Sequence, residues 1–221
     1  MPHAGFTSQY RAIGRVAACA VCWLEVAYAI TTVLGLLALQ SPSEPIGDPF
    51  FLIMELLIIL IVPLMVIVMV VVHLYAAPED KAYSLIALMF MLLVAGITSS
   101  VHFIVLTVGR SIESDELIWH PLFFSFQWPS VVYALDILAW DWFFALSMFS
   151  AAVVFKRSRW EIAVRSLMIV SGVLSLIGLI GVPLANMQIR NIGIIGYGGV
   201  APIMFLLLSL VFKQTIPSSN R

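Results

Sequence analysis

Charged residues are scarce in this 221-residue chain: Asp, Glu, Lys and Arg make up 10% of it, and hydrophobic residues make up 62%. Soluble domains carry about 25% charged residues, so this composition excludes a soluble globular domain. The mean hydropathy of +1.08 also indicates an integral membrane protein. A net charge of -1 gives no basis for binding nucleic acid, and we expect no such partner.

Cysteine is also rare, because the chain has only Cys19 and Cys22. Both lie within the first apolar run, so the sequence indicates no extracellular disulfide framework. Three residues apart on a helix, the two thiols share a face, which leaves a redox pair open as an alternative to simple packing. No motif identifies a cofactor, which is left unknown.

Long apolar runs are the feature that the chain has in abundance. Six of them reach the length of about 20 residues that a helix needs to cross a bilayer. They cover residues 16–39, 50–75, 82–108, 130–155, 162–185 and 192–212. We therefore predict an all-α, polytopic bundle of six transmembrane helices that forms a single integral membrane domain over residues 1–221. The longest loop, 112–129, is predicted to contain an interfacial segment.

The basic residues predict the orientation in the membrane. If the N-terminus is cytoplasmic, nine of the 11 basic residues fall inside: Arg11, Arg15, Lys81, Lys156, Arg157, Arg159, Arg165, Lys213 and Arg221. The outer loops then hold Arg110, Arg190 and the acids Glu44, Asp48, Glu113, Asp115 and Glu116. The positive-inside rule therefore predicts that both termini are cytoplasmic, in a plasma membrane or a bacterial inner membrane.

Four carboxyl groups interrupt the apolar runs: Glu25, Glu55, Asp136 and Asp141. An acid at the centre of a spanning helix costs about 2.5–3.5 kcal/mol on insertion scales. We expect no Lys or Arg at the same depth, so each acid must be protonated, hydrogen-bonded, hydrated or matched by a cation. The structural alternative is a neutral acid bonded to a polar side chain of another helix.

The depths of these acids define two levels. At 1.5 Å per residue, Glu25 and Asp141 lie about 13 and 16 Å into their spans, close to the midplane. Glu55 and Asp136 lie about 8–9 Å below the outer surface. His102 is near the outer end of the third span, so we expect it to join Glu55 and Asp136 in an outer group.

The positions of these acids along the chain also predict which basic residues can reach them and in which direction their side chains point. Arg110 and Arg190, at the outer rim, offer charge to Glu55 or Asp136. Glu25 and Asp141 are expected to lie beyond the reach of any basic side chain. Asp136 and Asp141 are five residues apart, about 140° around an α-helix, so we expect them to face different neighbours.

Binding or translocation of a cation, a proton-coupled solute or a small amphipathic ligand is the function that these acids favour. The candidate site combines the four acids with one imidazole and two indoles that could hold an organic cation: Glu25, Asp141, Glu55, Asp136, His102, Trp23 and Trp140. Glu25 and Asp141 are expected to be the central ligands or proton carriers.

Two other functions stay open. One is a membrane-embedded enzyme that acts on a lipid or isoprenoid, with His102 and the acids in acid–base roles. The other is a non-catalytic assembly or sensor subunit. Binding is favoured over catalysis, so no catalytic residue is assigned. Glu55, His102 and Asp136 are metal-ligand types, but their spacing is not a motif and no metal site is predicted.

Small residues mark one face of the fifth span: Ser171, Gly172, Ser175, Gly178 and Gly181. Such faces let helix backbones approach closely. We expect tight helix packing there, either within the chain or between copies in a homo-oligomer. The lipid bilayer is the other expected partner.

Overall fold

The protein is almost entirely helical. The computed structural model describes residues 6–41, 44–112 and 118–215, and no strand occurs in these ranges. Six helical segments within them are long and apolar enough to cross a membrane. These segments support the prediction of a multi-pass membrane protein, and they confirm the predicted all-α class and the number of candidate spans.

The six spans are built from helices and π-helical turns. The first two are α1 (Ser8–Leu37) and α2 (Phe50–Tyr75). The third joins a 3₁₀ turn η1 (Pro78–Asp80), α3 (Lys81–Ile104) and a π-helical turn η2 (Val105–Gly109). The fourth joins α5 (Val131–Ile137), a π-helical segment η4 (Leu138–Phe143) and α6 (Phe144–Ala152). The fifth is α7 (Arg159–Ile180), and the sixth joins α8 (Met187–Ile194), a π-helical segment η5 (Ile195–Val200) and α9 (Ala201–Gln214).

The sixth span begins earlier than predicted. The sequence placed its start at residue 192, whereas α8 begins at Met187. Asn186 is the reason, because its side-chain oxygen accepts hydrogen bonds from the backbone N–H groups of Gln188 and Ile189 at 3.0 and 3.2 Å. The sequence pattern placed Arg190 in an outer loop. That prediction was wrong, because Arg190 lies within α8.

A short helix, α4 (His120–Phe124), lies within the predicted interfacial segment 112–129. Leu122 and Phe123 are exposed on it, as an interfacial segment requires. Four residues used in the orientation argument lie outside the described part of the chain: Glu113, Asp115, Glu116 and Arg221.

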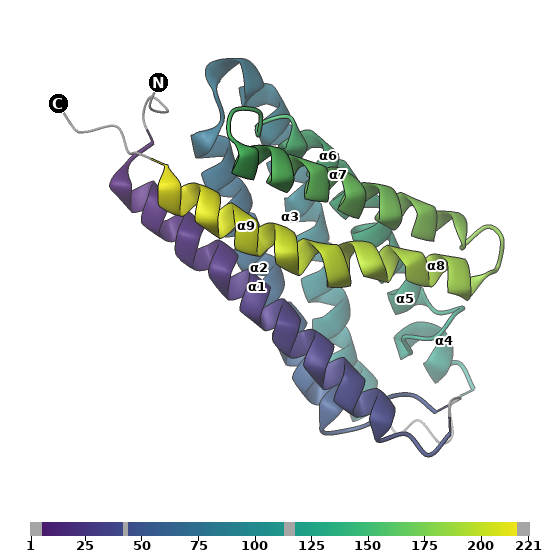
Figure 1. Cartoon of the computed structure of the whole chain (residues 1–221). Helices are drawn as coiled ribbons and strands as arrows, with labels where there is room; N and C mark the ends of the chain where they lie inside the picture. The colour runs from purple at the N-terminus through teal and green to yellow at the C-terminus, as the bar shows by residue number, and fades with distance from the viewer. Residues whose placement is uncertain (1–5, 42–43, 113–117, 216–221) are drawn as a thin grey trace.

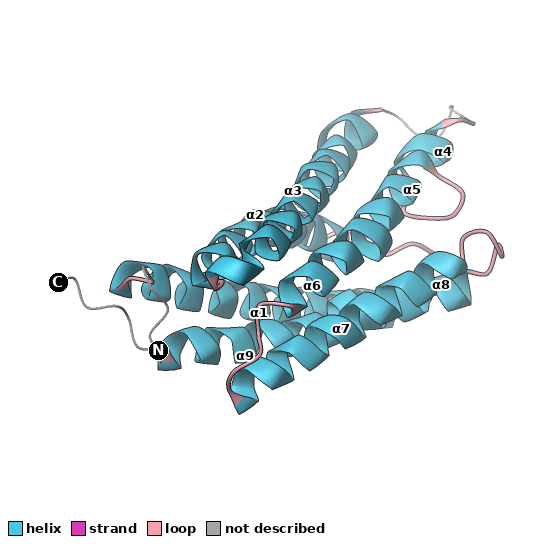
Figure 2. Cartoon of the chain, turned by 90° about the horizontal axis from the view of Figure 1, so that it is seen from above, coloured by secondary structure: helices cyan, strands magenta, loops and turns pink. Residues whose placement is uncertain are grey.

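The spans pack as antiparallel neighbours around one apolar core. Helix α1 lies along α2 and α9, α3 lies between α2 and α6, and α7 packs against α6, α8 and α9 (Figures 1 and 2). The small residues of α7 act within the chain: a Cβ at Gly178 would lie 2.7 Å from the Cα of Gly193. This face is therefore a contact between α7 and α8 of the same chain. The predicted homo-oligomer gains no support from this face and stays a prediction.

Aromatic rings hold together the end of the bundle at which α1 begins, which we call the terminal end. The Tyr75 ring lies 5.4 Å from Phe6, 5.9 Å from Phe155 and 5.9 Å from Phe212, between ring centroids. These contacts bring the start of α1 to the ends of α2, α6 and α9. The opposite end, at which α2, α5 and α8 begin, is called the far end.

Glu161 fixes the turn between α6 and α7 at the terminal end. Its carboxylate accepts hydrogen bonds from the Tyr75 hydroxyl at 3.1 Å and from the backbone N–H groups of Lys156 and Arg157 at 3.0 and 3.1 Å. Ser158 caps α7 by accepting a bond from the Glu161 N–H. One buried side chain thus links the turn to the end of α2.

We predict that Glu161→Ala lowers the free energy of unfolding by about 1–3 kcal/mol, because the buried Tyr75 hydroxyl and two partly buried backbone N–H groups lose their acceptor. Equilibrium unfolding in mixed micelles measures the loss. Glu79→Ala, which removes an exposed acid near the same end, is the matched control and should leave stability unchanged. Equal stability of the two variants would contradict the role given to Glu161.

Candidate functional site

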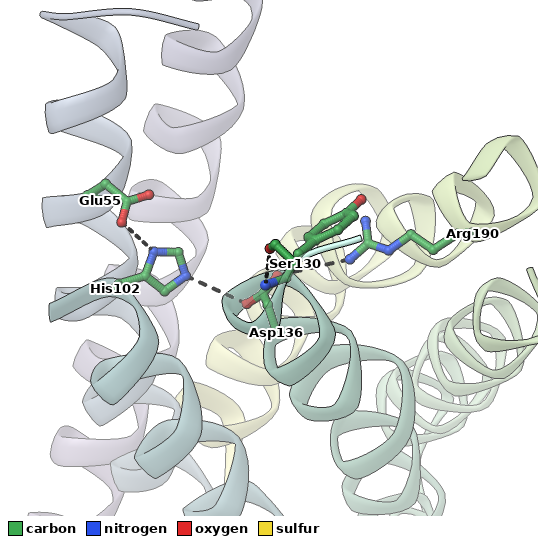
Figure 3. A network of polar contacts seen from close by, with 6 residues as sticks. Glu55, His102, Ser130, Asp136 and Arg190 are labelled. Carbon is green, nitrogen blue, oxygen red and sulfur yellow. Dashed lines mark hydrogen bonds and ion pairs between the residues drawn. The ribbon is translucent and has the colours of Figure 1, made fainter. Parts of the chain in front are cut away.

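The candidate site is a buried chain of acids and bases in the far half of the bundle. His102 of α3 is its centre: Nδ1 lies 2.8 Å from Oε2 of Glu55 on α2, and Nε2 lies 3.6 Å from Oδ1 of Asp136 on α5 (Figure 3). The side chains of Glu55 and His102 are 4% and 5% exposed. One imidazole therefore connects carboxyl groups from two other spans.

Arg190 extends this chain to a third carboxyl group. Its Nη2 lies 4.0 Å from Oδ2 of Asp136, and its Nε lies 3.5 Å from Oδ2 of Asp141 in η4. Arg190 is 2% exposed and Asp141 is fully buried. We call the five residues Glu55, His102, Asp136, Arg190 and Asp141 the acid–base network; it joins α2, α3, the fourth span and α8.

The π-helical segment η4 explains how both aspartates reach one arginine. In an α-helix, residues five apart face different directions, and on this basis we expected Asp136 and Asp141 to have different neighbours. Segment η4 follows Asp136 and contains Asp141, and its i to i+5 hydrogen-bonding pattern brings residues five apart nearer to one face. The expectation was wrong because the sequence gives no direct sign of a π-helical turn.

The contacts of His102 require hydrogens on both sides of the ring. The 2.8 Å contact with Glu55 is a hydrogen bond, which needs one hydrogen between nitrogen and oxygen. The opposite nitrogen faces Asp136, and a bare nitrogen against a carboxylate would set two lone pairs against each other. A second hydrogen on the ring replaces this repulsion by an attraction between opposite charges.

Aromatic side chains enclose the network. The ring of Phe126 stacks on His102 at 5.0 Å between centroids, and the guanidinium carbon of Arg190 lies 4.8 Å from the centre of the Tyr133 ring. Tyr28 of α1 and Tyr197 of η5 lie within electrostatic range of Arg190 and Asp136. These rings cover much of the network and strengthen its charge–charge contacts, while the Asp136 side chain keeps 15% exposure.

The glycine at position 193 makes room for the deepest acid. A Cβ at Gly193 would lie 2.1 Å from Oδ1 of Asp141, so a larger residue fits at this position only if the Asp141 carboxyl group moves. Four buried polar atoms of the network have no hydrogen-bond partner among the described residues: Oδ1 of Asp136, both carboxyl oxygens of Asp141 and Nε of Arg190. The network is thus connected mainly by charge, with long contacts around Arg190.

The structure brings together Glu55, His102 and Asp136, the outer group proposed from the sequence. The expectation that no basic side chain reaches Asp141 was wrong, because Arg190 lies 3.5 Å from it. Sequence reasoning named Arg190 only as a partner for the outer acids. Its true place could have been inferred from Asn186, which is a preferred residue immediately before a helix.

The other candidate residues do not join the network. Glu25 is buried, and its Oε2 has no hydrogen-bond partner among the described residues, so it stands apart from Asp141, with which it was expected to act. Trp23 is 64% exposed and points away from the bundle, so it does not line this site. Trp140 is buried, but its ring packs on Tyr197 and Phe144 at 5.2 and 5.6 Å.

The donor geometry does not favour a metal ion. The two nitrogens of His102 point to opposite acids, so one ion cannot be bound by Glu55, His102 and Asp136 together. No group of three His, Cys, Asp or Glu residues in the described ranges is arranged to hold one. Cys19 and Cys22 are both free thiols.

The described structure thus combines six candidate membrane spans, the mark of a multi-pass membrane protein, with a largely buried acid–base network. Comparisons with protein-family models, with curated proteins and with solved structures find no match for the chain. The functional argument therefore depends on the geometry of the network.

We predict that Gly193→Ala lowers the free energy of unfolding by about 1–3 kcal/mol, because the new methyl group forces Asp141 away from its position. Gly199→Ala is the matched control, because a Cβ at Gly199 would lie 3.8 Å from its nearest neighbour, Cγ2 of Ile195, which is an ordinary contact distance. Unfolding of both variants in mixed micelles measures the difference. A Gly193→Ala protein as stable as the control would show that Asp141 can move freely.

Proposed function

We propose that this protein is a proton-coupled membrane transporter, and that the acid–base network is where it binds the proton. The observation that carries the proposal is the position of His102 between Glu55 and Asp136, three side chains from three different spans. Ionisable residues at membrane depth are costly, and their usual roles are in ion pathways and proton relays.

The charges of the network favour proton uptake. With hydrogens on both sides of His102, two positive groups, His102 and Arg190, face three carboxylates, Glu55, Asp136 and Asp141. One negative charge remains in an enclosed apolar region, where an uncompensated charge is expensive. Adding a proton removes this charge, and Asp141 offers two oxygens without hydrogen-bond partners in the described structure.

A proton suits the network better than a larger cation does. Arg190 lies between Asp136 and Asp141, so a metal or organic cation placed between these acids would be repelled by the guanidinium. A proton adds to a single oxygen or nitrogen and needs no such space. The sequence alone suggested that Glu25 and Asp141 bind a cation or carry a proton. The proposal here is narrower: the acid–base network binds a proton, and any transported solute binds elsewhere.

The orientation gives the proton a direction. The terminal end carries Lys81, Lys156 and Arg157 close to the cytoplasmic ends proposed from the positive-inside rule. We infer that both termini are cytoplasmic, in a plasma membrane or bacterial inner membrane. The network, at the far half, then takes up protons from the outer side. Glu25, deeper in α1, is a second protonatable group on the way inward.

We predict that purified protein in liposomes carries protons inward when valinomycin and a potassium gradient impose a membrane potential. A pH-sensitive dye inside the vesicles reports the flux, in buffer alone and with choline chloride as a cationic solute. His102→Gln and Asp136→Asn should reduce it to the level of protein-free vesicles, because neither replacement can carry the proton.

Asp48→Asn is the control for this measurement, because Asp48 pairs with Arg110 on the exposed far end and outside the network. All variants are compared at equal incorporation after size-exclusion chromatography. Undiminished flux in both network variants would refute the proposed role of the network.

We predict that green fluorescent protein fused after Arg221 is fluorescent in a bacterial host, and that alkaline phosphatase fused there is inactive, because the C-terminus is cytoplasmic. Phosphatase fused in the loop between α1 and α2 should be active, which gives the opposite control. Active phosphatase at the C-terminus would reverse the orientation.

A further inference from the structure

An apolar groove of about 550 Å³ lies on the outside of the bundle between α3, α4 and α5. Its walls are aliphatic and aromatic except for the Ser100 hydroxyl, which donates to the carbonyl of Gly96 on its own helix. Its lining residues are Leu92, Leu93, Gly96, Ile97, Ser100, Val101, Ile104, Phe123, Phe124, Val131, Val132 and Leu135. The volume falls within the range of about 300–1,000 Å³ that ligand pockets occupy.

The groove has the dimensions of one bilayer leaflet. It follows α3 from Leu92 to Ile104, a rise of about 18 Å at 1.5 Å per residue. Half of the hydrocarbon core measures about 15 Å. The groove therefore extends from the far-end surface to about the middle of the membrane, along the direction in which lipid chains lie.

Helix α4 covers the far end of the groove. Nε2 of His120 lies 2.9 Å from the carbonyl oxygen of Gly109, which fixes α4 to the end of the third span. Phe124 also packs closely on Gly109, since a Cβ there would be 3.3 Å from the Phe124 Cβ. With α4 fixed above it, the groove is open to the side, where Leu92, Leu93 and Leu135 are exposed between 40 and 45%.

The inner wall separates the groove from the acid–base network. Val101 and Val132 are buried side by side with Val105, and the next residue after Val101 is His102, which lies about 100° further around α3 and faces Glu55 and Asp136. Among the residues that the structure describes, no charged side chain lines the groove. Its chemistry therefore fits a hydrocarbon chain and excludes a polar solute, which would lose its hydration without gaining partners.

We propose that the groove binds one acyl chain of a phospholipid from the far-end leaflet. The length of the groove, its lateral opening and its apolar walls all match such a chain. The bound lipid keeps its headgroup at the level of α4, outside the network. This site goes beyond the proposed proton transport and does not depend on it.

The proposal is tested by photo-crosslinking of the full chain in dioleoylphosphatidylcholine vesicles. The probe is a phosphatidylcholine that carries a diazirine on one acyl chain, and mass spectrometry maps the labelled peptides. We expect labelling concentrated on residues 92–104 and 131–135, saturated at low probe fraction and reduced by unlabelled phosphatidylcholine.

Gly96→Leu fills the groove and should remove the excess labelling, because a Cβ at Gly96 meets no atom within 4 Å and the helix tolerates a side chain there. Leu36→Phe, on an exposed position of α1, is the matched control and should keep it. Leu135→Trp, on the opposite wall, replaces Gly96→Leu if that variant does not elute as a single species. Equal labelling of all exposed helix faces, unchanged by Gly96→Leu or Leu135→Trp, would refute the site and leave the proton proposal unaffected.

Discussion

The placement of charge in a region that excludes water is the constraint on which this structure depends. Glu55 and Asp141 are buried, and the Asp136 side chain is 15% exposed, in an interior where each unpaired charge would cost several kcal/mol. His102 and Arg190 offset that cost only when α2, α3, the fourth span and α8 meet at one level. The requirement to pair these groups therefore selects the arrangement of the helices in the far half of the bundle.

Local backbone features serve the same requirement. The π-helical segment η4 turns Asp141 toward the arginine that Asp136 also approaches, and π-helical turns are frequent at functional sites. The Asn186 cap starts α8 before Arg190 and so holds the guanidinium inside the bundle. Gly193 leaves space for the Asp141 carboxylate. The terminal half, by contrast, is held together by aromatic contacts of Tyr75 and by the hydrogen bonds of Glu161. These contacts fix the helix ends relative to one another.

The sequence predicts the parts of this protein that depend on local composition. Span 50–75 matches α2 because an apolar run of that length, interrupted by little except Glu55 and Pro63, is long enough to form a membrane-spanning helix. The sequence also predicts that Glu55, His102 and Asp136 lie together, because each is a similar number of residues from the outer end of its span. The outward direction of Trp23 was also available, since it is two residues, about 200°, from the buried Glu25. The partners of Arg190 were harder to predict. Asn186 is a sign that a helix begins before Arg190, but the residues from Asn186 to Asn191 otherwise resemble a loop, and its acidic partners lie about 50 residues away in the sequence.

The central claim is that His102 holds a hydrogen on each side, one shared with Glu55 and one with Asp136. Nitrogen-15 NMR of the histidine ring in lipid bilayers tests it most directly, in the native protein and in the Glu55→Gln, Asp136→Asn double variant. We predict that both ring nitrogens of His102 have a proton in the native protein, that of Nδ1 in the hydrogen bond to Glu55 and that of Nε2 facing Asp136, and that the signals move in the variant. A ring with one bare nitrogen, and with the same signals in both proteins, would contradict the claim.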